Sequence, residues 1–165
     1  MQVRWRGLEL PARVEKDTMS STENFGRFTA EPFVRGMGTT IGNSLRRILL
    51  STIEGAAVTK VEIVGVKHEF DTLEGVLQDV TDIILNIKGL VVSMTGEGPK
   101  TMKLSAEGPG DVTAEMIECD TSITVHNPEH VVATLGPGVD FEATLTVETG
   151  RGYRPASEYY EDGEE

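Results

Sequence analysis

Residues 34–53, V-R-G-M-G-T-T-I-G-N-S-L-R-R-I-L-L-S-T-I, are the most informative part of this chain. Thr39 or Thr40 can cap a helix there, because a threonine oxygen accepts a hydrogen bond from a free amide of the first turn. At about 100° per residue, five apolar residues then share one stripe: Ile41, Leu45, Ile48, Leu49 and Ile53. The other side carries Asn43, Arg46, Arg47 and Leu50. This pattern predicts a helix that packs with one face and docks with the other.

The second face suits a protein partner, since two guanidinium groups flank an apolar side chain. Arg46 and Arg47 can each bind a carboxylate or a carbonyl while Leu50 loses its contact with water. The alternative is an ordinary surface helix on which a neighbouring loop half buries Leu50.

A second helix is predicted from an unbroken 3-4-3-4 apolar spacing at Leu73, Val76, Leu77, Val80, Ile83, Ile84 and Ile87. Asp71 and Glu74 resemble a capping box at its start. Lys88 and Gly89 predict a cationic last turn followed by a left-handed stop.

The rest of the chain has the alternation of short strands separated by glycine- and proline-rich turns. Strands are predicted at residues 27–33, 57–66, 90–94, 102–106, 122–125, 131–135 and 141–147. In the 57–66 strand the odd positions from Ala57 to Ile63 are expected to face inward, opposite Lys60 and Glu62. The predicted fold class is α+β, with two helices and a mostly antiparallel sheet system.

The composition excludes several classes of function. The net charge is −12, which argues against direct nucleic-acid binding because phosphate recognition needs a basic surface. Residues 1–50 hold eight Lys/Arg and five Asp/Glu, whereas the remainder holds seven and 22. A mildly basic segment before an acidic body favours protein docking. No apolar run is long enough to span a membrane, and one cysteine cannot form an internal disulfide, so a cytoplasmic location is expected.

No motif for catalysis or metal binding stands out. The Gly36–Gly42 segment resembles a nucleotide-binding loop, but its third glycine comes one residue late, and a tight strand-to-helix turn explains it better. Cys119, His126 and His130 could supply three metal ligands, yet Pro128 keeps the two histidines off one helical face. Solvated turn histidines and a buried cysteine are the favoured interpretation, with no catalytic and no metal residues on this chain.

Three segments of the sequence together resemble the amino-terminal domain of the bacterial RNA polymerase alpha subunit. They are R-G-M-G-T-T-I-G-N-S-L-R-R-I-L-L-S (35–51), H-E-F-D-T-L-E-G-V-L-Q-D-V-T-D-I-I-L-N-I-K-G-L (68–90) and G-R-G-Y-R-P-A (150–156). The resemblance extends from about Phe28 to Ala156. It implies an assembly scaffold that pairs with a second alpha subunit and docks the beta and beta-prime subunits, which hold Mg²⁺ and perform nucleotidyl transfer.

The resemblance also implies roles for individual residues. Arg47 would be the principal contact to beta, and the remaining contacts would be Arg35, Asn43, Arg46, Leu50, Glu69, Glu74, Asp79, Arg151 and Tyr153. The stripe of Ile41, Leu45, Ile48 and Leu49 would form the dimer or core face of the first helix. For Tyr153 the alternative is a ring folded down onto the sheet at the end of a strand.

The implied organisation has three parts. Residues 1–54 would begin the dimerisation subdomain, 55–157 would form an inserted sheet subdomain, and 158–165 would be an acidic, disordered tail. Family chains return with further helices after G-R-G-Y-x-P-A, so this chain is expected to be shortened and monomeric or weakly associating alone. Two alternatives stay open: a module that competes for beta and blocks assembly, and a small-ligand enzyme that uses the Gly36–Gly42 turn.

Overall fold

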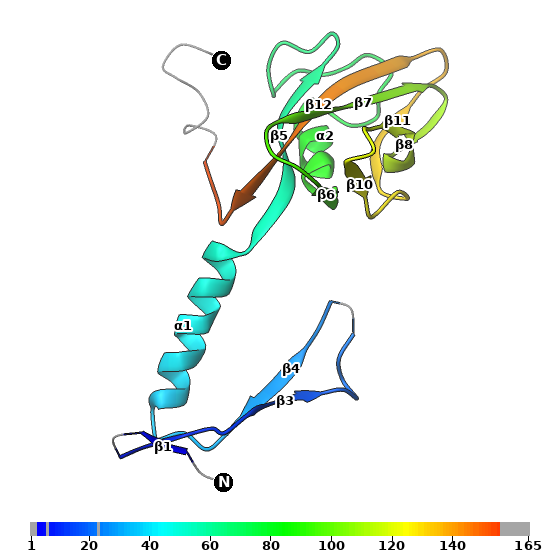
Figure 1. Ribbon diagram of the computed structural model, residues 1–165. Helices are drawn as coiled ribbons and strands as arrows, with labels where there is room; N and C mark the ends of the chain where they lie inside the picture. Colours follow the sequence, from blue (N-terminus) through cyan, green and yellow to red (C-terminus); the bar gives the residue numbers. More distant parts are fainter. Residues whose placement is uncertain (1–2, 6, 23, 156–165) are drawn as a thin grey trace. The chain divides into compact units, whose positions relative to one another are not determined.

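The computed structural model describes residues 3–5, 7–22 and 24–155, and the chain divides into two compact units, Met1–Thr52 and Ile53–Glu165. The first unit contains two antiparallel hairpins and one long helix (Figure 1). Their bounds are β1 (Val3–Trp5), β2 (Leu8–Leu10), β3 (Val14–Asp17), β4 (Arg27–Ala30) and α1 (Met37–Thr52). The strand predicted at 27–33 therefore ends at Ala30. The predicted tail, 158–165, lies outside the described residues.

Helix α1 begins two or three residues earlier than its predicted cap. Gly36 has a φ of +87°, which glycine adopts readily, and the Met37 amide donates to the Val34 carbonyl at 2.9 Å. The expectation that Thr39 or Thr40 caps the helix is wrong, because both lie inside α1. The Thr40 hydroxyl instead donates back to the Gly36 carbonyl at 3.4 Å.

The second unit is built on a four-stranded antiparallel sheet with the strand order β5-β12-β7-β9. These strands are β5 (Glu54–Ile63), β12 (Asp140–Arg151), β7 (Lys100–Glu107) and β9 (Ile117–Glu118). Two further antiparallel pairs join β6 (Val92–Met94) to β10 (Ile123–Val125) and β8 (Gly110–Thr113) to β11 (Val131–Leu135). Helix α2 (Val80–Lys88) and the short 3₁₀ turn η1 (Ala114–Met116) complete the unit. The predicted α+β class is confirmed.

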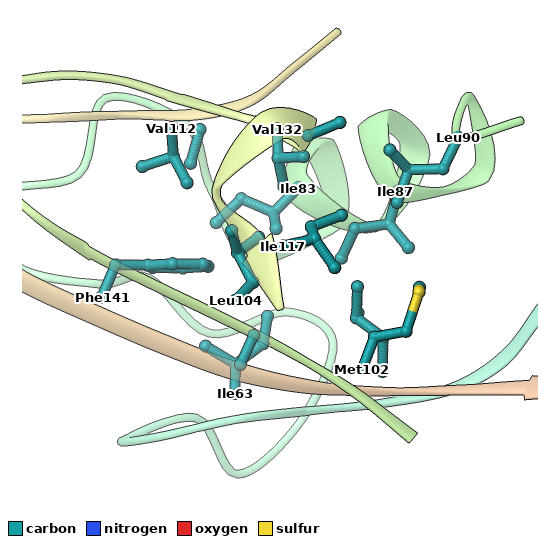
Figure 2. Close-up of a cluster of buried hydrophobic side chains, with 14 of the residues drawn as sticks. Ile63, Ile83, Ile87, Leu90, Met102, Leu104, Val112, Ile117, Val132 and Phe141 are labelled. Atoms are coloured by element: carbon teal, nitrogen blue, oxygen red, sulfur yellow. The ribbon is translucent and has the colours of Figure 1, made fainter. Parts of the chain in front are cut away.

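The hydrophobic core formed by the described side chains lies in the second unit. Of the side chains that the structure describes, the buried apolar ones all lie between Ile63 and Val147. Figure 2 shows Ile83 and Ile87 of α2 in the same cluster as Met102 and Leu104 of β7. One face of the sheet is thus buried by the helix, which is why every second residue from Met102 to Leu104 in β7 and from Phe141 to Val147 in β12 is buried, while the residues between them are exposed or half-buried.

The second helix is shorter than its apolar spacing predicts. It spans Val80–Lys88, and the preceding residues 71–79 form turns and extended chain instead. Gly75 has a φ of +78°, a left-handed conformation that interrupts a helix. The predicted capping box at Asp71 and Glu74 is therefore wrong. The left-handed stop is wrong too, because Gly89 has a φ of −79°.

Asp79 is the residue that caps α2. Its side chain accepts a hydrogen bond from the Asp82 amide at 2.8 Å. We expect Asp79→Ala to lower the free energy of unfolding by about 0.5–2 kcal/mol, since it leaves that amide without an acceptor. Asp79→Asn is the matched control, because asparagine caps equally well and should retain most of the stability. Urea denaturation of both variants measures the difference, and equal losses would contradict a capping role.

A bulge changes the alternation predicted for β5. Thr146 pairs with Lys60 while Val147 pairs with Val58, so Thr59 is an extra residue in β5. The odd positions face inward only from Val61 to Ile63. Before the bulge the even positions, Ala56 and Val58, pack against the core instead, because one added residue reverses the two faces of a strand.

Candidate protein-docking surfaces

The arginine face of α1 is open to solvent. Asn43, Arg46 and Arg47 are exposed, and Leu50 between them is 64% exposed. Arg35 is exposed in the turn before the helix. Within the described part of the chain, neither Arg46 nor Arg47 forms an ion pair. Both guanidinium groups therefore keep their full capacity to bind a carboxylate from another chain.

The apolar stripe of α1 is also uncovered. In this helix, all of whose residues the structure describes, no side chain is buried. Ile41 is half-buried, whereas Leu45, Ile48 and Leu49 are exposed. The apolar face that the periodicity predicts is present on α1. Its side chains are not buried against other residues of the same unit. A stripe of this kind on a rigid helix is typical of a surface that another segment or chain covers.

The carboxylates predicted to contact beta in the second unit have different local roles. Glu69 and Glu74 are exposed, while Asp79 serves as the helix cap. Beside them, the Lys67 amide donates to the Asp71 carboxylate at 2.9 Å. This hydrogen bond, with His68 as a smaller electrostatic contribution, lowers the pKa of Asp71 against the raising effect of desolvation. Asp71 is therefore ionised at neutral pH and holds the 67–71 turn closed.

Arg151 already has a partner on its own chain. Its Nε and Nη2 atoms donate to one oxygen of Glu54 at 3.2 and 2.7 Å. The two residues are directly paired across β12 and β5, so the ion pair closes the end of this strand pair. Tyr153, two residues on, is exposed rather than folded onto the sheet. The sequence offered no sign of the Glu54 partner, because the two residues are far apart along the chain.

The cysteine and histidines do not gather into a site. Cys119 is exposed, which contradicts the expectation that it is buried. His126 contacts the Ser93 hydroxyl at 2.8 Å, and His130 contacts the Asn86 carbonyl at 2.7 Å. Among the described residues, no three side chains of His, Cys, Asp and Glu are grouped so as to hold a metal ion. None of the described helices has the length and apolar character to cross a bilayer.

Sequence reasoning missed two exposed apolar side chains in the segment before α2. Phe70 is 77% exposed and Leu77 is 79% exposed. The helical spacing placed Leu77 in a buried stripe, yet this residue lies outside α2. The signal that could have revealed it is Gly75, which is a poor residue for a helix interior.

Taken together, the described residues form an uncovered amphipathic helix in one unit and a complete α+β core in the other. The family described as RNA polymerase Rpb3/RpoA insert domain matches residues 61–165. A DNA-directed RNA polymerase subunit alpha from Rhodopirellula baltica is 46% identical over 159 residues, which cover 96% of this chain and 48% of that protein.

The chain belongs to the bacterial RNA polymerase alpha-subunit family. It spans about half the length of the curated relative it matches. These two matches confirm the family that was predicted from the three sequence segments.

Proposed function

We propose that this chain is an assembly scaffold of DNA-dependent RNA polymerase in the cytoplasm, which pairs with a second alpha subunit and docks the beta and beta-prime subunits. The supporting observation is the face of α1 on which Arg46 and Arg47 flank the exposed Leu50. An apolar side chain between two unpaired guanidinium groups has the composition of a protein-interface centre, where arginine is enriched.

The remaining predicted contacts extend this interface in the proposal. Arg35 and Asn43 adjoin the arginine face in the same unit. Glu69 and Glu74 offer exposed carboxylates in the second unit, and Tyr153 offers an exposed ring. Arg151 would act while bonded to Glu54, which fixes the direction of its guanidinium group. Asp79 would contribute indirectly, because its carboxylate is hydrogen-bonded to the Asp82 amide and stabilises the first turn of α2.

In this proposal the chain supplies binding surfaces rather than chemistry. Nucleotidyl transfer and the Mg²⁺ it requires belong to the large subunits, and the chain contributes neither catalytic residues nor direct contacts to nucleic acid. Its acidic second unit is consistent with this division, because a negatively charged surface repels phosphates.

The direct test is reconstitution from purified components. The chain is mixed first with the beta subunit and then with beta-prime, and the products are separated by gel filtration. We expect the chain to co-elute with beta and to remain in the complex after beta-prime is added. Failure to bind either large subunit would contradict the scaffold role. Excess chain that instead blocks assembly by a full-length alpha subunit would identify a competitor.

Self-association of the chain alone is expected to be weak. The uncovered stripe of α1 is one narrow face, whereas a stable interface typically buries about 1,200–2,000 Å² in total. Sedimentation across a range of concentrations should show a monomer or a weak dimer, and Ile48→Asp should abolish any dimer formed through α1 by placing a charge in the stripe. A tight dimer at nanomolar concentration would contradict this expectation.

A further inference from the structure

Strand β5 forms one edge of the four-stranded sheet in the second unit. It is ten residues long, and within the described part of the chain β12 is the only strand hydrogen-bonded to it (Figure 1). The opposite edge strand, β9, has only two residues. A long edge strand presents a row of backbone donors and acceptors to which another strand can be added.

The hydrogen bonds of β5 show which backbone groups point outward. The Val64 amide donates to the Glu142 carbonyl at 3.0 Å, so residue 64 faces β12. In an antiparallel ladder, alternate residues face the neighbouring strand. The backbone N–H and C=O of Val61, three residues earlier, therefore point away from β12. The Ile63 carbonyl points the same way, since it accepts a bond from the Val66 amide at 3.2 Å.

The apolar side chains are also incompletely covered at this edge. Val61 packs against the core but is only half-buried, whereas its partner on β12, Leu145, is 0% exposed. A strand added beside β5 would cover the remaining apolar surface of Val61 while it satisfies the outward backbone groups.

The charges on either side of Val61 indicate what the added strand should be. Lys60 and Glu62 are both exposed, and the Lys60 ammonium lies 2.7 Å from the Glu62 carboxylate. If two copies of β5 pair antiparallel about Val61, Lys60 of each copy lies directly opposite Glu62 of the other. Opposite charges at directly paired positions stabilise a sheet. The sequence Lys60-Val61-Glu62 is therefore complementary to itself.

We propose that β5 is a second self-association surface, through which two copies of the chain pair antiparallel about Val61 and join their sheets into one. The contact lies within the second unit, and it depends neither on α1 nor on the proposed scaffold function. The bulge at Thr59 ends regular pairing. So short a contact buries less than the roughly 1,200 Å² at the lower limit of stable interfaces, and we expect a weak dimer.

Charge reversal in the full chain tests this pairing. Every sample carries Ile48→Asp, so that α1 contributes nothing, and sedimentation equilibrium measures association up to submillimolar concentrations. With β5 unchanged, we expect a weak dimer. Lys60→Glu and Glu62→Lys should each weaken it about tenfold, because like charges then lie opposite one another. An equimolar mixture of the two variants should restore the affinity as a heterodimer, since both facing pairs are again of opposite charge.

A disulfide tests the register of the two strands. Chains carrying Cys119→Ser and Ile48→Asp receive either Lys60→Cys or Glu62→Cys, and the two are mixed in a glutathione redox buffer. In the proposed register these positions form a pair without hydrogen bonds, whose Cα atoms are about 4.5 Å apart and suit a disulfide. We expect the mixed disulfide to exceed either symmetric one.

Lys103→Glu is the matched control, because it makes the same charge reversal at an exposed lysine on β7 of the same sheet. It should leave association unchanged. The proposal is overturned if the chain with unchanged β5 stays monomeric, if the mixture of reversed variants is no tighter than either alone, or if Lys103→Glu weakens association as much as Lys60→Glu. Symmetric disulfides that equal the mixed one would also contradict it.

Discussion

Replacing Arg47 with alanine is expected to weaken binding of the beta subunit by about 30-fold to several thousand-fold, which corresponds to about 2–5 kcal/mol. The size of the effect follows from desolvation. When the interface forms, the carboxylate that binds Arg47 loses its water, and removal of the guanidinium leaves that charge buried without a partner. Arg47 is exposed on α1, so the same change should leave the fold intact. Titration of beta with the purified variant measures the loss.

Arg27→Ala is the matched control, because Arg27 is an exposed arginine on β4 of the same unit and lies outside the docking face. It should bind beta as the unchanged chain does. Equal affinity of the Arg47 variant and the unchanged chain, with circular dichroism showing both folded, would remove Arg47 from the interface. A similar loss in both variants would indicate a general effect of charge rather than a specific contact.

Replacing Ile83 with alanine is expected to lower the free energy of unfolding of the second unit by about 2–5 kcal/mol. Ile83 lies on the buried face of α2 and is 0% exposed. The variant loses both the transfer free energy of three buried carbon atoms and the packing contacts around the space they leave. Denaturant unfolding monitored by circular dichroism measures the change.

Leu85→Ala provides a control on the same helix. Leu85 is 58% exposed on the side of α2 that faces away from the core, so its truncation should change stability by less than about 0.5 kcal/mol. Because both changes introduce alanine into α2, the difference between them isolates burial from helix propensity. Similar losses for the two variants would contradict the packing of α2 described above.

The sequence was most informative where local chemistry and tertiary packing require the same structure. The 34–53 stretch predicted α1 and its two faces, since the spacing of its apolar residues matches a helix. The alternating residues at 102–106 and 141–147 predicted strands, which β7 and β12 contain, and that alternation fits a sheet with the core on one side. The three sequence segments at 35–51, 68–90 and 150–156 also identified the family. The docking roles of Arg47 and its neighbours remain predictions.

The conformation of the segment around Leu77 depends on contacts with distant parts of the chain. The spacing from Leu73 to Ile87 fits a helix throughout, but the first part is held instead by bonds to Thr134, a residue more than 50 positions further along the chain. The bulge in β5 and the Arg151–Glu54 pair likewise depend on which strands become neighbours. Apolar periodicity records which residues avoid water. It does not record which distant backbone groups will satisfy the hydrogen bonds of a segment. For the segment before α2, those distant hydrogen bonds determine the backbone conformation.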